Sequence, residues 1–207
     1  MLGSSKGGQL EVLQWICKPA EADPDIEWYH DSDDDNVNEF LILAASLGEL
    51  LLIQWFYENI ITIRGREFQR KAVRKILLGS SKLHVLQWTA SKFTEVFEYS
   101  FARNMNVLNE VLLGAIRENQ LETLYWLEQE FGEELDWYFD NEEWKFSPYC
   151  STSPFEAALQ AENVSLLQWV ADREDHSTLT STLVMDSLRN GRITCSAFQW
   201  LLDEYEQ

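Results

Sequence analysis

Cysteine and histidine are scarce in this sequence of 207 residues, and their scarcity limits the chemistry that it can support. The three cysteines, Cys17, Cys150 and Cys195, lie far apart and form no C-x-x-C pair, so neither a disulfide framework nor a zinc site is indicated. The three histidines are equally scattered, and no phosphate-binding glycine loop or metal-ligand spacing is present. We therefore expect no metal, no cofactor and no catalytic residues.

Long apolar runs are also absent. The longest contain only a few residues, whereas a membrane-spanning helix needs roughly 20. The amino-terminal stretch "MLGSSKGGQLEV" lacks the apolar core of a signal peptide. Apolar residues still make up 45% of the sequence, which is enough for a globular core. These features favour a cytoplasmic or nuclear protein without a membrane segment.

Positive charge is sparse, because 16 basic residues stand against 35 acidic ones and the net charge is −19. Such a field disfavours nucleic acid and anionic membranes, and it favours cationic partners. The exception is "IRGREFQRKAVRK", whose cations include Arg64, Arg70 and Arg74 and whose one acid is Glu67. This segment has two interpretations: a solvated helix face that pairs with nearby acids, or a docking patch for an acidic partner.

Tryptophan, in contrast, is abundant, with nine residues, and six of them end copies of one motif. The copies are "QLEVLQW", "ELLLIQW", "KLHVLQW", "QLETLYW", "NVSLLQW" and "TCSAFQW", which end at Trp15, Trp55, Trp88, Trp126, Trp169 and Trp200. Apolar residues recur five and two residues before each tryptophan and one residue after it, with Thr89 as the exception. These positions form one arc of a helix, so each repeat tryptophan is predicted to pack at the rim of a buried helix face.

A turn and an earlier apolar segment precede most copies. Gly48 and Asn119 lie seven residues before their tryptophans, and both residue types tolerate the left-handed conformation that ends a helix. Gly79 is assigned the same role in the third copy. Ser153 to Glu156, "SPFE", has the pattern of a capping box at a helix start. The predicted repeat is therefore a helix, a tight turn, a second helix and a variable loop, and neighbouring repeats must stack to bury their apolar faces.

This repeat resembles the ankyrin repeat. "LAASLGELLLIQW", Leu43 to Trp55, matches the family's A-A-x-x-G-x-L-x-x-L core, and "EAALQAENVSLLQW", Glu156 to Trp169, is the next best copy. The tryptophan-ended style is similar to divergent ankyrin arrays of oomycetes, amoebae and large DNA viruses. The resemblance implies an all-α solenoid of about six degenerate repeats in one domain, 1–207, with an incomplete first repeat. Because the T-P-L-H opening is absent and the spacing is irregular, regular β-hairpins are in doubt, and a HEAT-like solenoid stays open as an alternative.

The other three tryptophans, Trp28, Trp137 and Trp144, lie outside this register in acidic insertions near 19–37 and 132–152, which are predicted to be loops. Two of them, Trp28 and Trp137, share a sequence setting. The stretches are "DPDIEWYHD" and "EELDWYFD". In the ankyrin family, inter-repeat loops and the inner helix face usually bind proteins, and aromatic residues commonly anchor interfaces. The candidates for docking a basic partner are Trp28, Tyr29, Asp31, Trp137, Tyr138 and Asp140. The other interpretation is that each ring packs onto its own repeat.

The function favoured by these patterns is a non-catalytic protein–protein interaction module. The expected partner is another protein with a basic surface, and neither nucleic acid nor a membrane is expected to bind. Two alternatives stay open: a segment or cap of a larger repeat scaffold, and an enzyme built on a helical scaffold.

Overall fold

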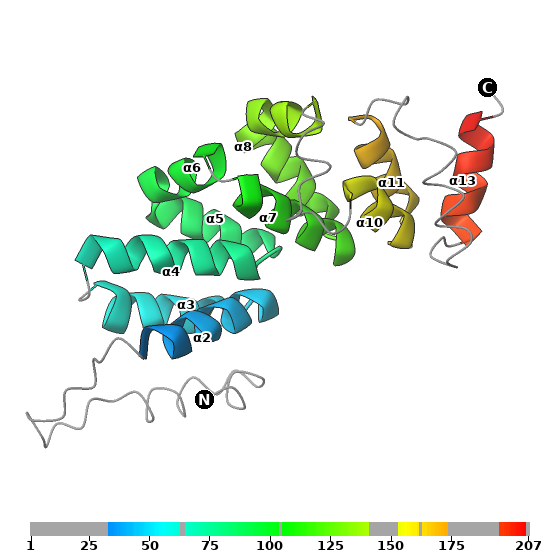
Figure 1. Ribbon diagram of the computed structural model, residues 1–207. Coiled ribbons are helices and arrows are strands. Elements are labelled where there is room, and N and C mark those ends of the chain that lie inside the picture. The colour runs from blue at the N-terminus through cyan, green and yellow to red at the C-terminus, as the bar shows by residue number, and fades with distance from the viewer. Residues whose placement is uncertain are drawn as a thin grey trace, which may run out of the picture. The chain divides into compact units, whose positions relative to one another are not determined.

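The computed structural model describes residues 33–62, 65–103, 105–140, 153–161, 163–173 and 195–205. Within these ranges the chain is helical apart from short turns, and no strand is present (Figure 1). The prediction of an all-α fold is therefore confirmed.

The described helices follow the tryptophan motif along the sequence. Four pairs carry the copies that end at Trp55, Trp88, Trp126 and Trp169, and a further helix carries Trp200. In every pair the tryptophan lies on the second helix, as the repeat predicts. The pairs are α2 (Asp33–Leu47) with α3 (Leu50–Phe56), α4 (Gly65–Gly79) with α5 (Leu83–Lys92), α7 (Met105–Arg117) with α8 (Leu121–Asp140), and α10 (Pro154–Gln160) with α11 (Val164–Ala171); the further helix is α13 (Cys195–Tyr205).

The turns of the second and fourth copies have the same backbone geometry. Gly48 has a φ of 74° and Asn119 a φ of 57°, so both adopt the predicted left-handed conformation. The amide of Glu49 donates to Ala44 O at 2.9 Å, and the amide of Gln120 donates to Ala115 O at 2.8 Å. These bonds are those of a Schellman motif, which satisfies carbonyl groups that the end of a helix leaves open.

Two other local predictions have different outcomes. The capping prediction at Ser153 is confirmed, because its Oγ accepts a hydrogen bond from the amide of Glu156 at 3.0 Å. The assignment of Gly79 to a turn is wrong, because Gly79 is the last residue of α4 and Ser80 and Ser81 follow it. A Cβ at Gly79 would lie 2.5 Å from Ile42 O in α2. Glycine therefore permits close approach of two helix backbones there.

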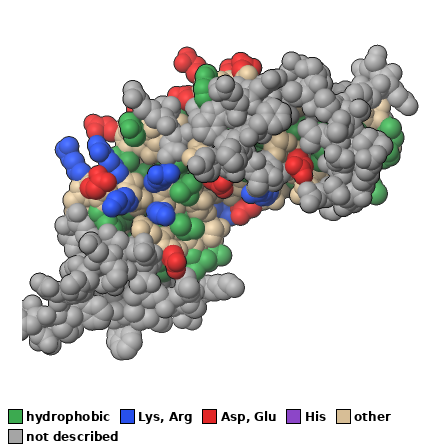
Figure 2. Space-filling view, in the orientation of Figure 1, with side chains coloured by type: hydrophobic (Ala, Val, Ile, Leu, Met, Phe, Trp, Pro, Cys, Tyr) green, Lys and Arg blue, Asp and Glu red, His purple; other side chains and the backbone are tan. Residues whose placement is uncertain are grey.

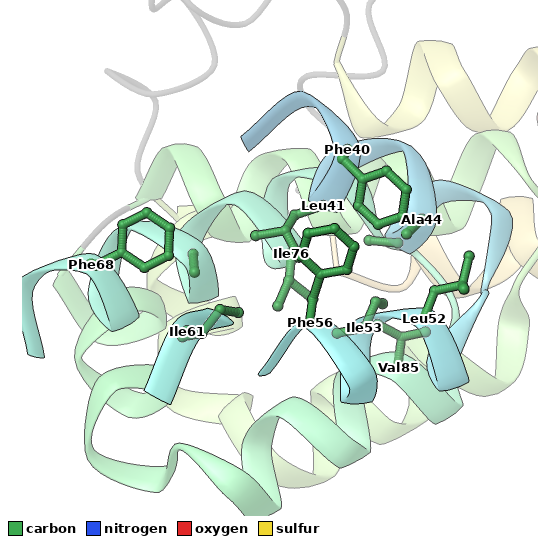
Figure 3. Close-up of a cluster of buried hydrophobic side chains, with 12 residues drawn as sticks. Phe40, Leu41, Ala44, Leu52, Ile53, Phe56, Ile61, Phe68, Ile76 and Val85 are labelled. Atoms are coloured by element: carbon green, nitrogen blue, oxygen red, sulfur yellow. The ribbon is translucent and has the colours of Figure 1, made fainter. Parts of the chain in front are cut away.

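The chain divides into two compact units, one whose described residues end at Ser100 and one that begins at Phe101. In unit 1, α2 packs against both α3 and α4. Phe40 and Phe56 stack at 4.3 Å between ring centroids in the centre of its core (Figure 3). His84 Nε2 in α5 donates to the Gly48 carbonyl at 2.9 Å, which links one helix pair to the turn of the preceding pair.

Unit 2 repeats this scheme with other side chains. Helix α10 packs against α7 and α11, and α11 packs against α13. The Asn163 side chain caps α11 by accepting hydrogen bonds from the amides of Ser165 and Leu166. Its Nδ2 also donates to Asn119 Oδ1, at the turn of the preceding pair. In both units, therefore, a polar side chain near the start of a second helix contacts the preceding turn.

A third helical segment follows the pair in the third and fourth copies. Phe93 (φ −130°, ψ 40°) and Phe131 (φ −135°, ψ 37°) each lie five residues after a repeat tryptophan and share one non-helical conformation. Helix α6 (Thr94–Arg103) begins after Phe93, and residues 132–140 of α8 follow the kink at Phe131. In the second copy, α3 continues instead into a π-helical turn, η2 (Tyr57–Ile61).

The prediction of a loop near 132–152 is wrong for residues 132–140, which are helical, and residues 141–152 lie outside the described part of the chain. The reason lies in a buried stripe formed by Leu135, Tyr138 and Phe139, whose spacing of three and four residues fits one helix face. Burial of this stripe stabilises a helix despite the acids around it.

We predict that Gly79→Ala lowers the free energy of unfolding by about 1–3 kcal/mol, because the new methyl group would force α4 away from the α2 backbone. Urea denaturation measures the change. Gly132→Ala is the control, since no atom lies within 4 Å of a Cβ there and alanine favours a helix. Equal stability of the two variants would contradict the close approach at Gly79.

Candidate functional site

Some predicted site residues lie outside the described part of the chain. They are Trp15, Trp28, Tyr29, Asp31 and Arg64. The acidic insertion near 19–37 is described only from Asp33, where α2 begins. The candidate surfaces within the described ranges lie on the third segments and on α4.

The described repeat tryptophans lie at the edges of packed cores. Trp55, Trp88, Trp126 and Trp200 are half-buried, and Trp169 is buried, with 4% of its surface exposed. Trp55 and Trp88 pack against the core of unit 1. The environments of Trp55 and Trp88 are apolar and aromatic, as expected for residues that pack against a core.

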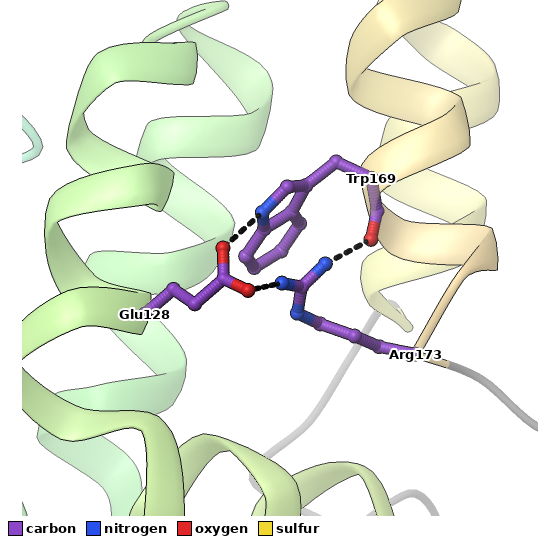
Figure 4. A network of polar contacts seen from close by, with 3 residues as sticks. All are labelled: Glu128, Trp169 and Arg173. Atoms are coloured by element: carbon purple, nitrogen blue, oxygen red, sulfur yellow. Dashed lines mark hydrogen bonds and ion pairs between the residues drawn. The ribbon is translucent and has the colours of Figure 1, made fainter.

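Trp169 belongs to a polar junction between α8 and α11 (Figure 4). Its indole Nε1 donates to Glu128 Oε2 at 3.3 Å, while the guanidinium of Arg173 lies 3.9 Å from the ring centroid. Arg173 also pairs with Glu128 and donates to the Trp169 carbonyl at 2.8 Å. These contacts join α8 of the fourth copy to α11 of the fifth.

The predicted docking pair of the fourth copy is divided between two environments. Trp137 is 45% exposed, whereas Tyr138 is only 4% exposed. The Tyr138 hydroxyl donates to Asn109 Oδ1 in α7 at 2.6 Å, so this ring packs onto its own repeat. Trp137 and Asp140 face outward from the same helix. Trp137 and Tyr138 have different environments because consecutive residues of a helix point about 100° apart.

The third copy contains an equivalent exposed ring that the sequence reasoning missed. Tyr99 in α6 is 65% exposed and lies eleven residues after Trp88, as Trp137 lies eleven after Trp126. The stretches "FTEVFEYSF" and "FGEELDWYF" align from the kink phenylalanine onward, with Phe101 and Phe139 buried at their ends. Alignment on the repeat tryptophans, instead of on the Trp-Tyr dipeptide, would have found this pair.

Exposed acids surround both rings. In the fourth copy these acids are Glu133, Asp136 and Asp140, and in the third copy they are Glu95 and Glu98. The fourth copy therefore presents a large aromatic side chain within a negative surface, whereas Glu95 of the third copy lies beside Arg66 and Arg70 as well as on the helix of Tyr99. Such a surface can bury an aromatic anchor in a partner while its acids attract cations.

Helix α4 has the opposite charge. Arg70 and Arg74 are exposed on it, together with Arg66 and Lys71, and Figure 2 shows Lys and Arg side chains gathered over this part of unit 1. Among the residues that the structure describes, no acid forms an ion pair with Arg66, Arg70 or Arg74. Ion pairs between these three arginines and nearby acids, which one of the two interpretations expects, are therefore absent from the described ranges.

Metal clusters and membrane-spanning helices are absent from the same described ranges. No group of three His, Cys, Asp or Glu side chains is placed there to hold a metal ion. Nor does any helix described by the structure have the length and apolar character that crossing a membrane requires. The candidate surfaces of the described ranges are those of the third segments and of α4.

We predict that Trp137→Phe removes a component of tryptophan emission that acrylamide quenches readily, because this ring is 45% exposed. Trp169→Phe is the matched variant and should remove a shielded component, since that ring is 4% exposed. The measurement is the difference in Stern–Volmer quenching between each variant and the wild type. If the emission lost in Trp137→Phe were poorly quenched by acrylamide, the outward orientation of Trp137 would be contradicted.

We expect Glu128 and Arg173 to be coupled by about 0.5–1.5 kcal/mol in a double-mutant cycle of Glu128→Gln and Arg173→Met. The coupling is modest because the Glu128 side chain is 44% exposed and solvent screens its charge. Urea unfolding of the four proteins gives the value. The same cycle with Glu130→Gln, an exposed acid on the same helix, should show coupling near zero; equal coupling in both cycles would indicate only a general charge effect.

Comparison with known proteins adds no relative. No family model, no curated protein and no solved structure matches this sequence. The resemblance to ankyrin repeats therefore rests on the motif residues of the chain itself.

Proposed function

We propose that this protein is a non-catalytic protein-interaction module, a solenoid of ankyrin-like helix pairs that binds a partner with a basic surface. The repeat architecture is supported by helix pairs that follow the tryptophan motif and by similar contacts of His84 and Asn163 with the preceding turns. The third segments depart from the ankyrin pattern, because helices occupy positions where that family has hairpin loops.

The observation that carries the proposal is the outward ring on each third segment. Tyr99 and Trp137 occupy equivalent positions, and both remain exposed although Phe101 and Phe139, two residues later, are buried. Tyr138, the neighbour of Trp137, is instead buried and donates to Asn109 Oδ1. Exposed aromatics held on a rigid helix resemble the anchors that dominate the binding energy of protein interfaces.

The charge around the rings defines the class of partner. Exposed acids flank both rings, and the net charge of the chain is −19. A basic partner would be attracted over long range, and its cations would meet these acids at the rim of the contact. The aromatic ring supplies apolar burial and can also stack with an arginine or lysine of the partner. Binding should therefore weaken as salt concentration rises.

The test uses the full chain and an array of basic, neutral and acidic peptides of equal length, each bearing one aromatic residue. We predict that basic peptides bind best and that Trp137→Ala weakens their binding about tenfold or more, the size expected for an interface anchor. Tyr125→Ala is the control, because Tyr125 is 53% exposed on the same helix but precedes the kink. It should change affinity less than about twofold, within the usual range for a neutral surface change. Fluorescence anisotropy gives the affinities, and circular dichroism checks that both variants fold.

Two results would reject the proposal. One is a preference for neutral or acidic peptides at the third segments. The other is an equal loss of affinity in Trp137→Ala and Tyr125→Ala, which would show that the third segment has no special role.

A further inference from the structure

A groove lies in unit 1 between α4 and the junction of α5 with α6. Its walls are Arg66, Gln69 and Arg70 on one side and residues Lys92 to Val96 on the other, and it encloses about 280 Å³. The break at Phe93 creates the second wall, because α5 ends and α6 begins there. The groove is thus a product of the same kink that starts the third segment.

Positive charge predominates in this groove. Arg66, Arg70 and Lys92 line it, and Glu95 is the one acid among its lining residues. Arg66 and Arg70 are four residues apart, about 6 Å along the helix, and Arg74 extends the same row by one more turn. Such a row can contact successive carboxylates of an extended chain, and arginine suits carboxylates because it donates two parallel hydrogen bonds.

The cation of the opposite wall is held in place by an aromatic ring. Lys92 Nζ lies 4.9 Å from the centroid of the Tyr57 ring, which itself packs edge-on against Phe93 and Trp88. This cation–π contact restrains the ammonium group beside the groove without neutralising its charge. Lys92 therefore remains available to an anionic ligand.

The groove also has an apolar part. Phe93 is 8% exposed, and Val96 is half-buried beside it. A simple anion would use the cations alone, whereas a peptide could bring both a carboxylate and an apolar side chain. The volume accommodates one or two side chains, and not a folded domain.

We infer that this groove binds an acidic peptide segment of a partner protein, with carboxylates on Arg66 and Arg70 and an apolar side chain against Phe93 and Val96. Charge complementarity selects the ligand, because no acid among the described residues pairs with these arginines. A nucleic acid is disfavoured, since its continuous phosphate charge meets the field of a chain with a net charge of −19. A short acidic segment adds few charges and places them locally.

This site differs from the proposed contact at Trp137 in position and in charge. The two can be tested separately, because Arg66 and Arg70 belong to unit 1 and Trp137 to unit 2. A protein with both sites would bind basic and acidic segments at different surfaces.

The experiment measures binding of the full chain to a fluorescent peptide of glutamates with one central leucine, by anisotropy at low and high salt. We predict that Arg70→Glu weakens binding about tenfold or more, because it removes a charge-assisted hydrogen bond and adds repulsion. The control is Lys71→Glu, which makes the same change of charge at the adjacent exposed residue of α4 but outside the groove. Its effect should stay below about threefold, the size of a screened, longer-range charge effect.

Further ligands distinguish an acidic peptide from the other molecules that could occupy the groove. A peptide with glutamine in place of glutamate should not bind, and a glutamate peptide without leucine should bind less tightly than the parent. The inference is overturned if Arg70→Glu and Lys71→Glu have equal effects, if the glutamate peptide does not bind, or if a single-stranded oligonucleotide of equal charge binds as tightly. Salt-sensitive self-association of the wild type, abolished by Arg70→Glu, would overturn it in favour of a second copy of this chain.

Discussion

The edge-on contact between a repeat tryptophan and the phenylalanine five residues later decides much of what this structure presents to its surroundings. Trp88 meets Phe93 at 5.9 Å and Trp126 meets Phe131 at 6.1 Å, with nearly perpendicular rings in both cases. Each phenylalanine leaves helical geometry, so the chain changes direction and a third helical segment begins. The exposed rings and the basic groove both follow from this change of direction.

Local features of the fold could be predicted from the sequence because their causes are local. Gly48 and Asn119 adopt the expected left-handed conformation because glycine and asparagine tolerate a positive φ whatever packs around them. Gly79 was misassigned because glycine serves two purposes, and only the position of Ile42 in another helix shows which one applies. The third segment of the fourth copy is predicted as a loop because acids are abundant there, and the buried stripe that contains Leu135 and Phe139 is evident only with the kink in place.

In the candidate sites, too, some features have local causes and others depend on residues of another helix. Trp137, Arg70 and Arg74, which the sequence marks as candidates, are all exposed, whereas Tyr138 beside Trp137 packs onto its own repeat, as the second interpretation of these rings predicts. Which of two neighbouring rings faces outward depends on helical phase, and Asn109 in another helix completes the environment of Tyr138. The groove could not be predicted, because its two walls are about 25 residues apart and meet only after packing.

The shared backbone conformation of Phe93 and Phe131 has a consequence for how such an array can change. Each third segment starts from the same geometry on the same ring contact, so it behaves as a module that is appended to the helix pair. Substitution of the exposed residues of this segment, such as Glu98 and Tyr99, would alter the displayed side chains, whereas Phe97 and Phe101 are buried and Phe101 stacks on Phe131 of the next copy. Repeats of unequal length can therefore coexist in one chain, and the exposed side chains of a third segment can vary while its buried phenylalanines keep the packing.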